Sequence, residues 1–248
     1  MIKRAAVTIR RRRCAWRSVI SVAVLALAAL DGAAAHAGDA NADSSSRCTS
    51  DVMLVLDASG SMAASDFSDG APNRMHRVRV ALARVVPAVS RVRRIGLIVY
   101  GPGKTHNSCG HVDLKFTPSP DAASTIMDIA DRLRPLGRTP LVRSVEMAID
   151  VLKDRPRPAE IVVLTDGEDT CGGDPCGLAH RLKAAGGDVT VHVVGFRLPK
   201  ESETSGARCL ADATGGKFAV AETTDELEAA LRETLSCAVV SGLNGSSP

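Results

Sequence analysis

Residues 51–62 read DVMLVLDASGSM and contain the pattern that decides the fold. The first part, Asp51 to Asp57, is a short apolar run between two acids, which is typical of a strand buried on both faces. One carboxylate and two hydroxyls, those of Asp57, Ser59 and Ser61, then follow around Gly60. A buried strand that ends in a tight polar loop predicts an α/β sheet with a ligand site beyond the carboxyl end of the strand.

The rest of the chain repeats this alternation of apolar strands and amphipathic helices. Strands are predicted at 51–57, 95–100, 112–116, 161–165, 189–196 and 217–221, and helices at 73–89, 119–133, 139–152, 178–185, 206–214 and 223–235. Ser119 and Thr139 each precede a proline and are the predicted caps of their helices, while Pro87 predicts a kink or an early stop. The order predicts one α/β domain: a doubly wound, mostly parallel six-stranded sheet with helices on both faces. Strand 112–116 is expected to be an antiparallel edge strand, because only a hairpin-length connection precedes it.

Two further oxygen-bearing residues are expected at the same edge of the sheet. Asp166 follows the strand at 161–165, and Thr139 stands in the loop before its helix. Together with Asp57 and the two serines they offer three hydroxyls and two carboxylates, hard ligands that suit Mg²⁺ or, by similar chemistry, Ca²⁺ or Mn²⁺. Taken singly, each has a plainer structural interpretation: helix capping for Asp57 and Ser59, and an ordinary turn for Asp166 with Gly167.

The ordered set Asp57-x-Ser59-x-Ser61, Thr139 and Asp166-Gly167 resembles the metal-ion-dependent adhesion site of von Willebrand factor type A domains. The resemblance covers about residues 48–237. It implies that the two serines and Thr139 coordinate the metal directly, that the two aspartates act mostly through water, and that a partner protein supplies an Asp or Glu to the open position. The loop at 166–176 is similar to that of exported bacterial members. The insert at 63–72 departs from compact members and has no assigned role.

The first 37 residues have the pattern of a secretory signal peptide. A basic segment from Lys3 to Arg17 precedes a short apolar run at 19–30, and Ala35-His36-Ala37 is a small-x-small cleavage site. The apolar run is well short of the ~20 residues that a membrane helix needs, although an uncleaved anchor is the alternative. We therefore expect a secreted or periplasmic protein with a polar linker at 38–47, a domain at 48–238 and a flexible tail at 239–248.

Export changes the interpretation of the cysteines. Six follow the signal segment, and an even number in an exported chain favours disulfides. Cys48 and Cys237 flank the domain and are expected to pair, because the ends of such a domain commonly lie close together. The short loop between Cys171 and Cys176 favours a local pair, which leaves Cys109 for Cys209. A weaker alternative makes Cys171, Cys176 and His180 half of a zinc site.

Three acids in the loop after Asp166 and one histidine in a strand have less specific interpretations. Glu168, Asp169 and Asp174 lack EF-hand spacing, so they predict an acidic rim or simply a solvated loop. His192 lies inside an apolar strand and is most simply a hydrogen-bonded core histidine.

Composition limits the choice of function. Aromatic residues make up 2% of the chain, and seven of the 31 Lys and Arg lie before residue 18, so the rest is mildly acidic. This excludes a stacking platform or basic footprint for nucleic acid. The predicted function is a monomeric, non-enzymatic module that binds an acidic partner protein through Mg²⁺. The alternative is an extracytoplasmic hydrolase that uses the metal or a thiol, against which stands the lack of a motif that positions a general base.

Overall fold

The computed structural model describes residues 51–66, 68, 70, 72–103, 105–155, 159–186, 189–198 and 205–236. The expected signal peptide at 1–37, the linker at 38–47, the tail at 239–248 and both members of the expected Cys48–Cys237 pair lie outside these residues. None of the helices in the described ranges is both long and apolar enough to cross a membrane.

A single six-stranded sheet forms the centre of this part of the chain. Its strands are β1 (Asp51–Asp57), β2 (Ile95–Tyr100), β3 (Val112–Ser119), β4 (Ala159–Thr165), β5 (Val189–Phe196) and β6 (Phe218–Ala221). They lie in the order β3-β2-β1-β4-β5-β6. Every neighbouring pair is parallel except β2 with β3, which is antiparallel. The expected doubly wound sheet with an antiparallel edge strand is therefore confirmed.

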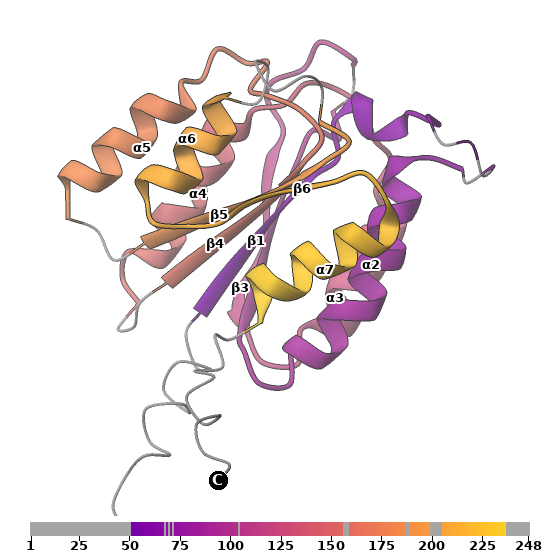
Figure 1. Cartoon of the computed structure of the whole chain (residues 1–248), viewed down its shortest axis with the longest axis horizontal. Helices are drawn as coiled ribbons and strands as arrows, with labels where there is room; N and C mark the ends of the chain where they lie inside the picture. The colour runs from indigo at the N-terminus through magenta and orange to yellow at the C-terminus, as the bar shows by residue number, and fades with distance from the viewer. Residues whose placement is uncertain are drawn as a thin grey trace, which may run out of the picture. The chain divides into compact units, whose positions relative to one another are not determined.

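Helices cover both faces of the sheet. The helical elements are η1 (Gly60–Ala63), α2 (Arg74–Val89), α3 (Ala123–Arg132), α4 (Leu141–Leu152), α5 (Pro175–Ala184), α6 (Ser205–Ala213) and α7 (Thr224–Leu235). Figure 1 shows α2, α3 and α7 on one face and α4, α5 and α6 on the other. Each layer closes its own apolar core against the sheet.

Strand β1 illustrates why a continuous apolar run is needed at the centre. Val52, Leu54 and Leu56 pack into the core under α2 and α7, whereas Met53 and Val55 pack into the core under α4. All five side chains are fully buried. Because successive residues of a strand point to opposite faces, a strand covered on both sides has no position left for a solvated polar residue.

The edge strand is longer than predicted, and the next helix starts later. β3 continues to Ser119, which pairs with Ile95, and α3 begins only at Ala123. Ser119 therefore does not cap the helix. Pro118 is tolerated within this outer strand because its missing N–H can face away from the sheet. Asp121 then adopts a left-handed φ of 51° in the turn that separates β3 from α3.

The start of α4 also differs from the prediction. α4 begins at Leu141 with Pro140 as its N-cap and no side-chain capping bond, so Thr139 does not cap it. α2 ends at Val89, as predicted, and runs past Pro87, so the early stop did not occur. Pro87 lies in the last turn, where it costs one backbone hydrogen bond and leaves the rest of the helix intact.

The strand order places a topological switch point between β1 and β4. The chain winds outward from β1 through β2 to β3 on one side, and from β4 through β5 to β6 on the other. In open sheets of this kind the loops beyond the carboxyl ends of the two central strands diverge and leave a crevice for a ligand. Asp57 and Asp166, at the ends of β1 and β4, border that crevice.

Candidate metal centre

Four of the five predicted metal-binding residues are joined by hydrogen bonds at this switch point. Ser59 Oγ lies 2.9 Å from Ser61 Oγ. Ser61 Oγ in turn donates to Asp166 Oδ1 at 2.6 Å. The backbone N–H of Ser59 donates to Asp57 Oδ1 at 2.7 Å. Ser59 precedes η1 but makes no side-chain capping bond, so the capping interpretation does not hold for it.

Asp57 is held by hydroxyl groups that the sequence did not single out. Tyr100 and Thr165 each donate an O–H to Asp57 Oδ2 at 2.9 Å. Both are the last residues of strands that neighbour β1, and Tyr100 is the direct register partner of Asp57. Their positions could have been found from the sequence by aligning the carboxyl ends of the predicted strands. The carboxylate is thus fixed by neutral donors on both of its oxygens.

Thr139 lies beside this group without a hydrogen bond to it. Its backbone pairs with Thr170: the Thr139 N–H donates to Thr170 Oγ1 at 2.9 Å, and the Thr170 N–H donates to the Thr139 carbonyl at 3.0 Å. Within the described ranges, no hydrogen bond joins the Thr139 side chain to the other four predicted residues. The segment that carries it is anchored two residues earlier, where Gly60 N–H donates to the Gly137 carbonyl at 3.0 Å.

Two glycines allow these loops to approach so closely. Gly101 and Gly137 have φ values of 99° and 87°, a region that other residues rarely adopt. A Cβ atom on Gly101 would collide with the backbone of Ser59, and one on Gly137 would collide with the Gly101 carbonyl. The loop after β1 therefore packs directly against main-chain atoms of the neighbouring loops.

The spacing of the oxygens fits an octahedral cation. Ligands at about 2.1 Å from Mg²⁺ lie about 3 Å apart along an octahedral edge. The Ser59 and Ser61 hydroxyl oxygens, 2.9 Å apart, are close to this value, and Asp166 Oδ1 lies 2.6 Å from Ser61 Oγ. Asp57, Ser59, Thr139 and Asp166 are buried, while Ser61 is exposed, so the group opens to the outside at one point. The donor set and its spacing therefore fit a hard divalent ion.

The raised pKa values of the two carboxylates also favour a bound cation. Burial raises the pKa of Asp57, against hydrogen bonds from Ser59, Tyr100 and Thr165 that lower it. Burial and the charge of Asp57 raise the pKa of Asp166 to about 7, although Ser61 and Arg74 act in the opposite direction. Burial, followed by the charge of Asp57, also raises the pKa of Tyr100. Two like charges held close in a buried position favour a bound cation.

Arg74 is a residue of this site that the sequence did not indicate. Its Nη1 donates to Asp166 Oδ2 at 2.9 Å, on the carboxylate oxygen opposite the one that Ser61 contacts. Arg74 opens helix α2, directly after the insert at 63–72. No motif predicts where such an insert turns back, so only the structure shows that the arginine reaches Asp166.

Comparisons with known proteins agree with this geometry. Residues 52–168 match the family model described as von Willebrand factor type A domain. The chain contains a von Willebrand factor type A domain. The structure extends the fold beyond the matched residues, because β5, α6, β6 and α7 complete the sheet and its helical layers.

Three known proteins show the range of the similarity. The uncharacterized protein YwmD of Bacillus subtilis is 24% identical over 187 residues, which cover 72% of this chain and 82% of that protein. The von Willebrand domain of the type V pili tip protein Mfa5 from Porphyromonas gingivalis superposes with a TM-score of 0.58 at 14% identity, covering 81% of this chain and 98% of that one. Proximal thread matrix protein 1 from the mussel byssus, solved with a zinc-occupied MIDAS motif, gives 0.55 at 17% identity, covering 76% and 46%. At these identities the structures show the fold alone.

Two disulfides tie the loops of the type A domain together, in pairs that differ from the prediction. Cys109 pairs with Cys171, with Cα atoms 5.7 Å apart, and Cys176 pairs with Cys209, at 5.2 Å. The expected pairs Cys171–Cys176 and Cys109–Cys209 are therefore wrong. Cys176 lies in the first turn of α5, which packs against α6 where Cys209 resides, whereas Cys171 remains in the loop before α5. The prediction from short sequence separation was wrong because α5 begins between Cys171 and Cys176.

The weaker zinc interpretation, with Cys171, Cys176 and His180, does not hold for the oxidised chain, because Cys171 and Cys176 each belong to a disulfide. A related cluster meets the second of these disulfides. Ligand atoms of Cys176, His180 and Cys209 lie within 4.8 Å of one another. The two sulfurs are bonded to each other, however, and zinc needs thiolates. In its oxidised form the domain therefore does not offer this cluster as a zinc site.

The three acids that follow Asp166 hold the domain's loops in place. Asp169 accepts backbone N–H groups of Val142, Cys171 and Gly173 at 2.7 to 2.9 Å, which closes the loop onto the start of α4. Asp174 caps α5 by accepting from Gly177 N–H at 2.9 Å. Burial raises the pKa of Glu168, while the N–H groups that begin α6 lower it. Each of these carboxylates therefore accepts from backbone donors, a role that the sequence did not indicate.

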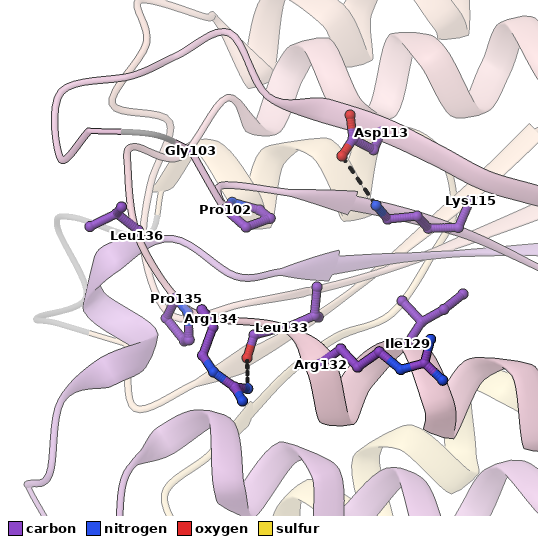
Figure 2. Close-up of a pocket in the computed structure, with 10 residues that line it drawn as sticks. All are labelled: Pro102, Gly103, Asp113, Lys115, Ile129, Arg132, Leu133, Arg134, Pro135 and Leu136. Atoms are coloured by element: carbon purple, nitrogen blue, oxygen red, sulfur yellow. Dashed lines mark hydrogen bonds and ion pairs between the residues drawn. The ribbon is translucent and has the colours of Figure 1, made fainter.

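A pocket of about 570 Å³ lies beside the candidate site. Figure 2 shows its lining, which comes from β3, α3, the segment 133–136 and the loop after β2. Lys115, Arg132 and Arg134 bring three positive charges against the single carboxylate of Asp113, which pairs with Lys115 at 3.1 Å. Leu136 connects the pocket to the site, because its N–H donates to the Ala58 carbonyl at 3.1 Å.

Proposed function

We propose that this chain is an exported, divalent-metal-dependent protein-binding module. In this proposal Ser59, Ser61 and Thr139 hold Mg²⁺ directly, and Asp57 and Asp166 hold it mainly through water. The open coordination position takes an Asp or Glu side chain of a partner protein. The single observation that carries the proposal is that the Ser59 and Ser61 hydroxyl oxygens lie 2.9 Å apart beside two buried carboxylates, one of which accepts a hydrogen bond from Ser61.

Other features support the location and the class of partner. Two disulfides favour a compartment outside the reducing cytoplasm. The similar folds include a pili tip protein and a byssus matrix protein, both of which belong to extracellular assemblies by their names. The basic pocket next to the site suits an acidic partner surface, because complementary charge steers and orients association.

The residues of the site would have different roles in binding. Tyr100 and Thr165 keep Asp57 in one orientation, so that its carboxylate faces the serine loop. Ser61, the exposed member, marks the side from which the partner approaches. The bound ion would supply a positive charge to which a carboxylate coordinates. Nothing in this arrangement favours the hydrolase alternative, and the four described cysteines are all oxidised and so cannot act as nucleophiles.

Calorimetric titration of the full oxidised chain with Mg²⁺ and Mn²⁺ tests the metal site. We expect Asp57→Ala, Ser59→Ala and Asp166→Ala each to weaken binding by about 100-fold or more, since each removes a group that holds or orients the ion. Ser90→Ala, a buried serine away from the site at the end of α2, serves as the control. Equal affinity of wild type and Asp57→Ala would place the metal elsewhere.

Capture of partners by the immobilised chain, in Mg²⁺ or in EDTA, tests the binding role. The proposal expects capture that EDTA abolishes and Mg²⁺ restores. Thr139→Ala is expected to bind the ion only a little more weakly but to lose the partner. Partner binding that is unaffected by EDTA and by Asp166→Ala would refute metal dependence.

A further inference from the structure

Arg74 is fixed between two carboxylates at the edge of the candidate metal centre. Its Nη1 donates to Asp166 Oδ2 at 2.9 Å, and its Nε lies 3.1 and 3.3 Å from the two oxygens of Asp66. The Asp166 side chain is fully buried, and that of Arg74 is only 15% exposed. The guanidinium is therefore a permanent positive charge in a region of low polarisability, where charges act strongly on one another.

The insert at 63–72 holds this arginine in place. The Arg74 N–H donates to the Ala64 carbonyl at 2.9 Å, which folds the two ends of the insert together. Asp66, within the insert, also contacts Arg197, whose Nη2 donates to the Asp66 carbonyl at 3.3 Å. Arg197 also pairs with Glu222 at 2.9 Å. Ala64 and Asp66 thus act as a bracket that fixes Arg74 on Asp166.

The charges at the site show what such a bracket does. Asp57 and Asp166 together supply two negative charges, which a divalent ion alone would neutralise. Arg74 places one positive charge 2.9 Å from Asp166, and Asp66 offsets that charge only in part because it pairs with the same guanidinium. The arginine therefore opposes binding of a cation beside Asp166.

We infer that Arg74, held by Ala64 and Asp66, is a built-in cation that weakens binding of the divalent ion at this site. This inference rests on the proposed metal site and assigns a role to two residues of the insert.

Calorimetry of the full oxidised chain with Mg²⁺ and Mn²⁺ tests the inference directly. Removing the charge in Arg74→Gln is expected to tighten ion binding about tenfold or more, and the gain is expected to shrink as salt rises. Arg74→Lys keeps the charge and is expected to stay within about threefold of wild type. Arg84→Gln removes an exposed arginine from the same helix and is expected to change nothing.

The outcomes separate the inference from the proposed function. If wild type binds the ions and Arg74→Gln binds them no more tightly, the inference fails while the metal site stands. If neither protein binds either ion, the metal site fails and the inference falls with it. Arg74→Met, which keeps much of the apolar stem of arginine, gives the same comparison if the glutamine variant does not fold, as judged by its thermal unfolding in EDTA.

Discussion

The two central strands, β1 and β4, carry acids at both of their ends. The acids at the amino ends have different partners from those at the carboxyl ends. At the amino ends, Asp51 pairs with two arginines, Arg94 and Arg155, at 3.2 Å each. Glu160 lies 2.8 Å from Arg93 Nη2 and 3.4 Å from His192 Nε2. At the carboxyl ends, Asp57 is held by neutral hydroxyl and N–H donors, and Asp166 has Arg74.

The difference appears in the protonation of the carboxylates. The pKa of Glu160 is lowered, because Arg93 and His192 outweigh the opposing effect of burial. The pKa values of Asp57 and Asp166 are raised, because burial outweighs their hydrogen bonds. One end of the sheet therefore uses its acids for stability. The other end holds Asp57 with neutral donors and gives Asp166 one arginine, which does not offset the effect of burial, and this arrangement favours a bound cation.

Arg93 offers the largest test of this comparison. Its side chain is 1% exposed, and besides Glu160 it contacts the Leu235 carbonyl at the end of α7 at 2.8 Å. We expect Arg93→Ala to lower the free energy of unfolding by about 3 kcal/mol, because it leaves buried acceptors without their donor. Urea denaturation measures the change, with exposed Arg84→Ala as the matched control. A near-neutral Arg93→Ala would remove the stabilising role of the amino end.

A matched pair of substitutions on β1 sharpens the contrast. Asp51→Asn is expected to cost about 1–2 kcal/mol of unfolding free energy, since it weakens two charged hydrogen bonds. Asp57→Asn, measured in EDTA, is expected to stay within about 1 kcal/mol of wild type or to exceed it, because it removes one of two like charges. The two variants share a residue type, a strand and a replacement. If Asp57→Asn proved the more damaging, the acids at the carboxyl end would be structural.

The smallest expected effect is the pH dependence that Glu160 contributes. A carboxylate whose folded pKa lies below its ordinary value near 4.5 stabilises the fold above that pH, and this stabilisation is lost as the pH falls through the folded value. Glu160 faces Arg93 and His192, which both favour its charged form. Glu160→Gln should therefore be less stable than wild type at pH 7, by about 1 kcal/mol, and the gap should narrow below pH 4.5. A constant gap from pH 7 to pH 3 would contradict this.

The sheet and most of the site could be predicted because they depend on patterns that are local in sequence. Continuous apolar runs identified the buried strands, and polar residues directly after them marked the carboxyl ends. Asp57, Ser59, Ser61 and Asp166 then had to meet once β1 and β4 were neighbours. His192 is also confirmed as a hydrogen-bonded histidine, since its Nδ1 accepts the Lys217 N–H at 3.0 Å.

The features that could not be predicted depend on the paths of loops and on the packing of helices, which no local sequence pattern contains. The approach of Arg74 to Asp166 is set by the path of the insert, and the disulfide pairs are set by the packing of α5 on α6. Ser119 and Thr139 have the local pattern of helix caps, but strand pairing of β3 and the backbone bonds between Thr139 and Thr170 take precedence.

The loops around the serine segment touch it through main-chain atoms. The Gly60 N–H donates to the Gly137 carbonyl, and the Leu136 N–H donates to the Ala58 carbonyl. The Arg138 N–H donates to the Ser108 carbonyl at 3.0 Å and so joins the two neighbouring loops to each other. Side chains on the outer surface of the same loops, such as Thr105, His106 and Asn107, are exposed and take no part in these bonds. Under the proposed function, substitutions at such positions would change the surface offered to a partner while the metal-binding oxygens stay the same.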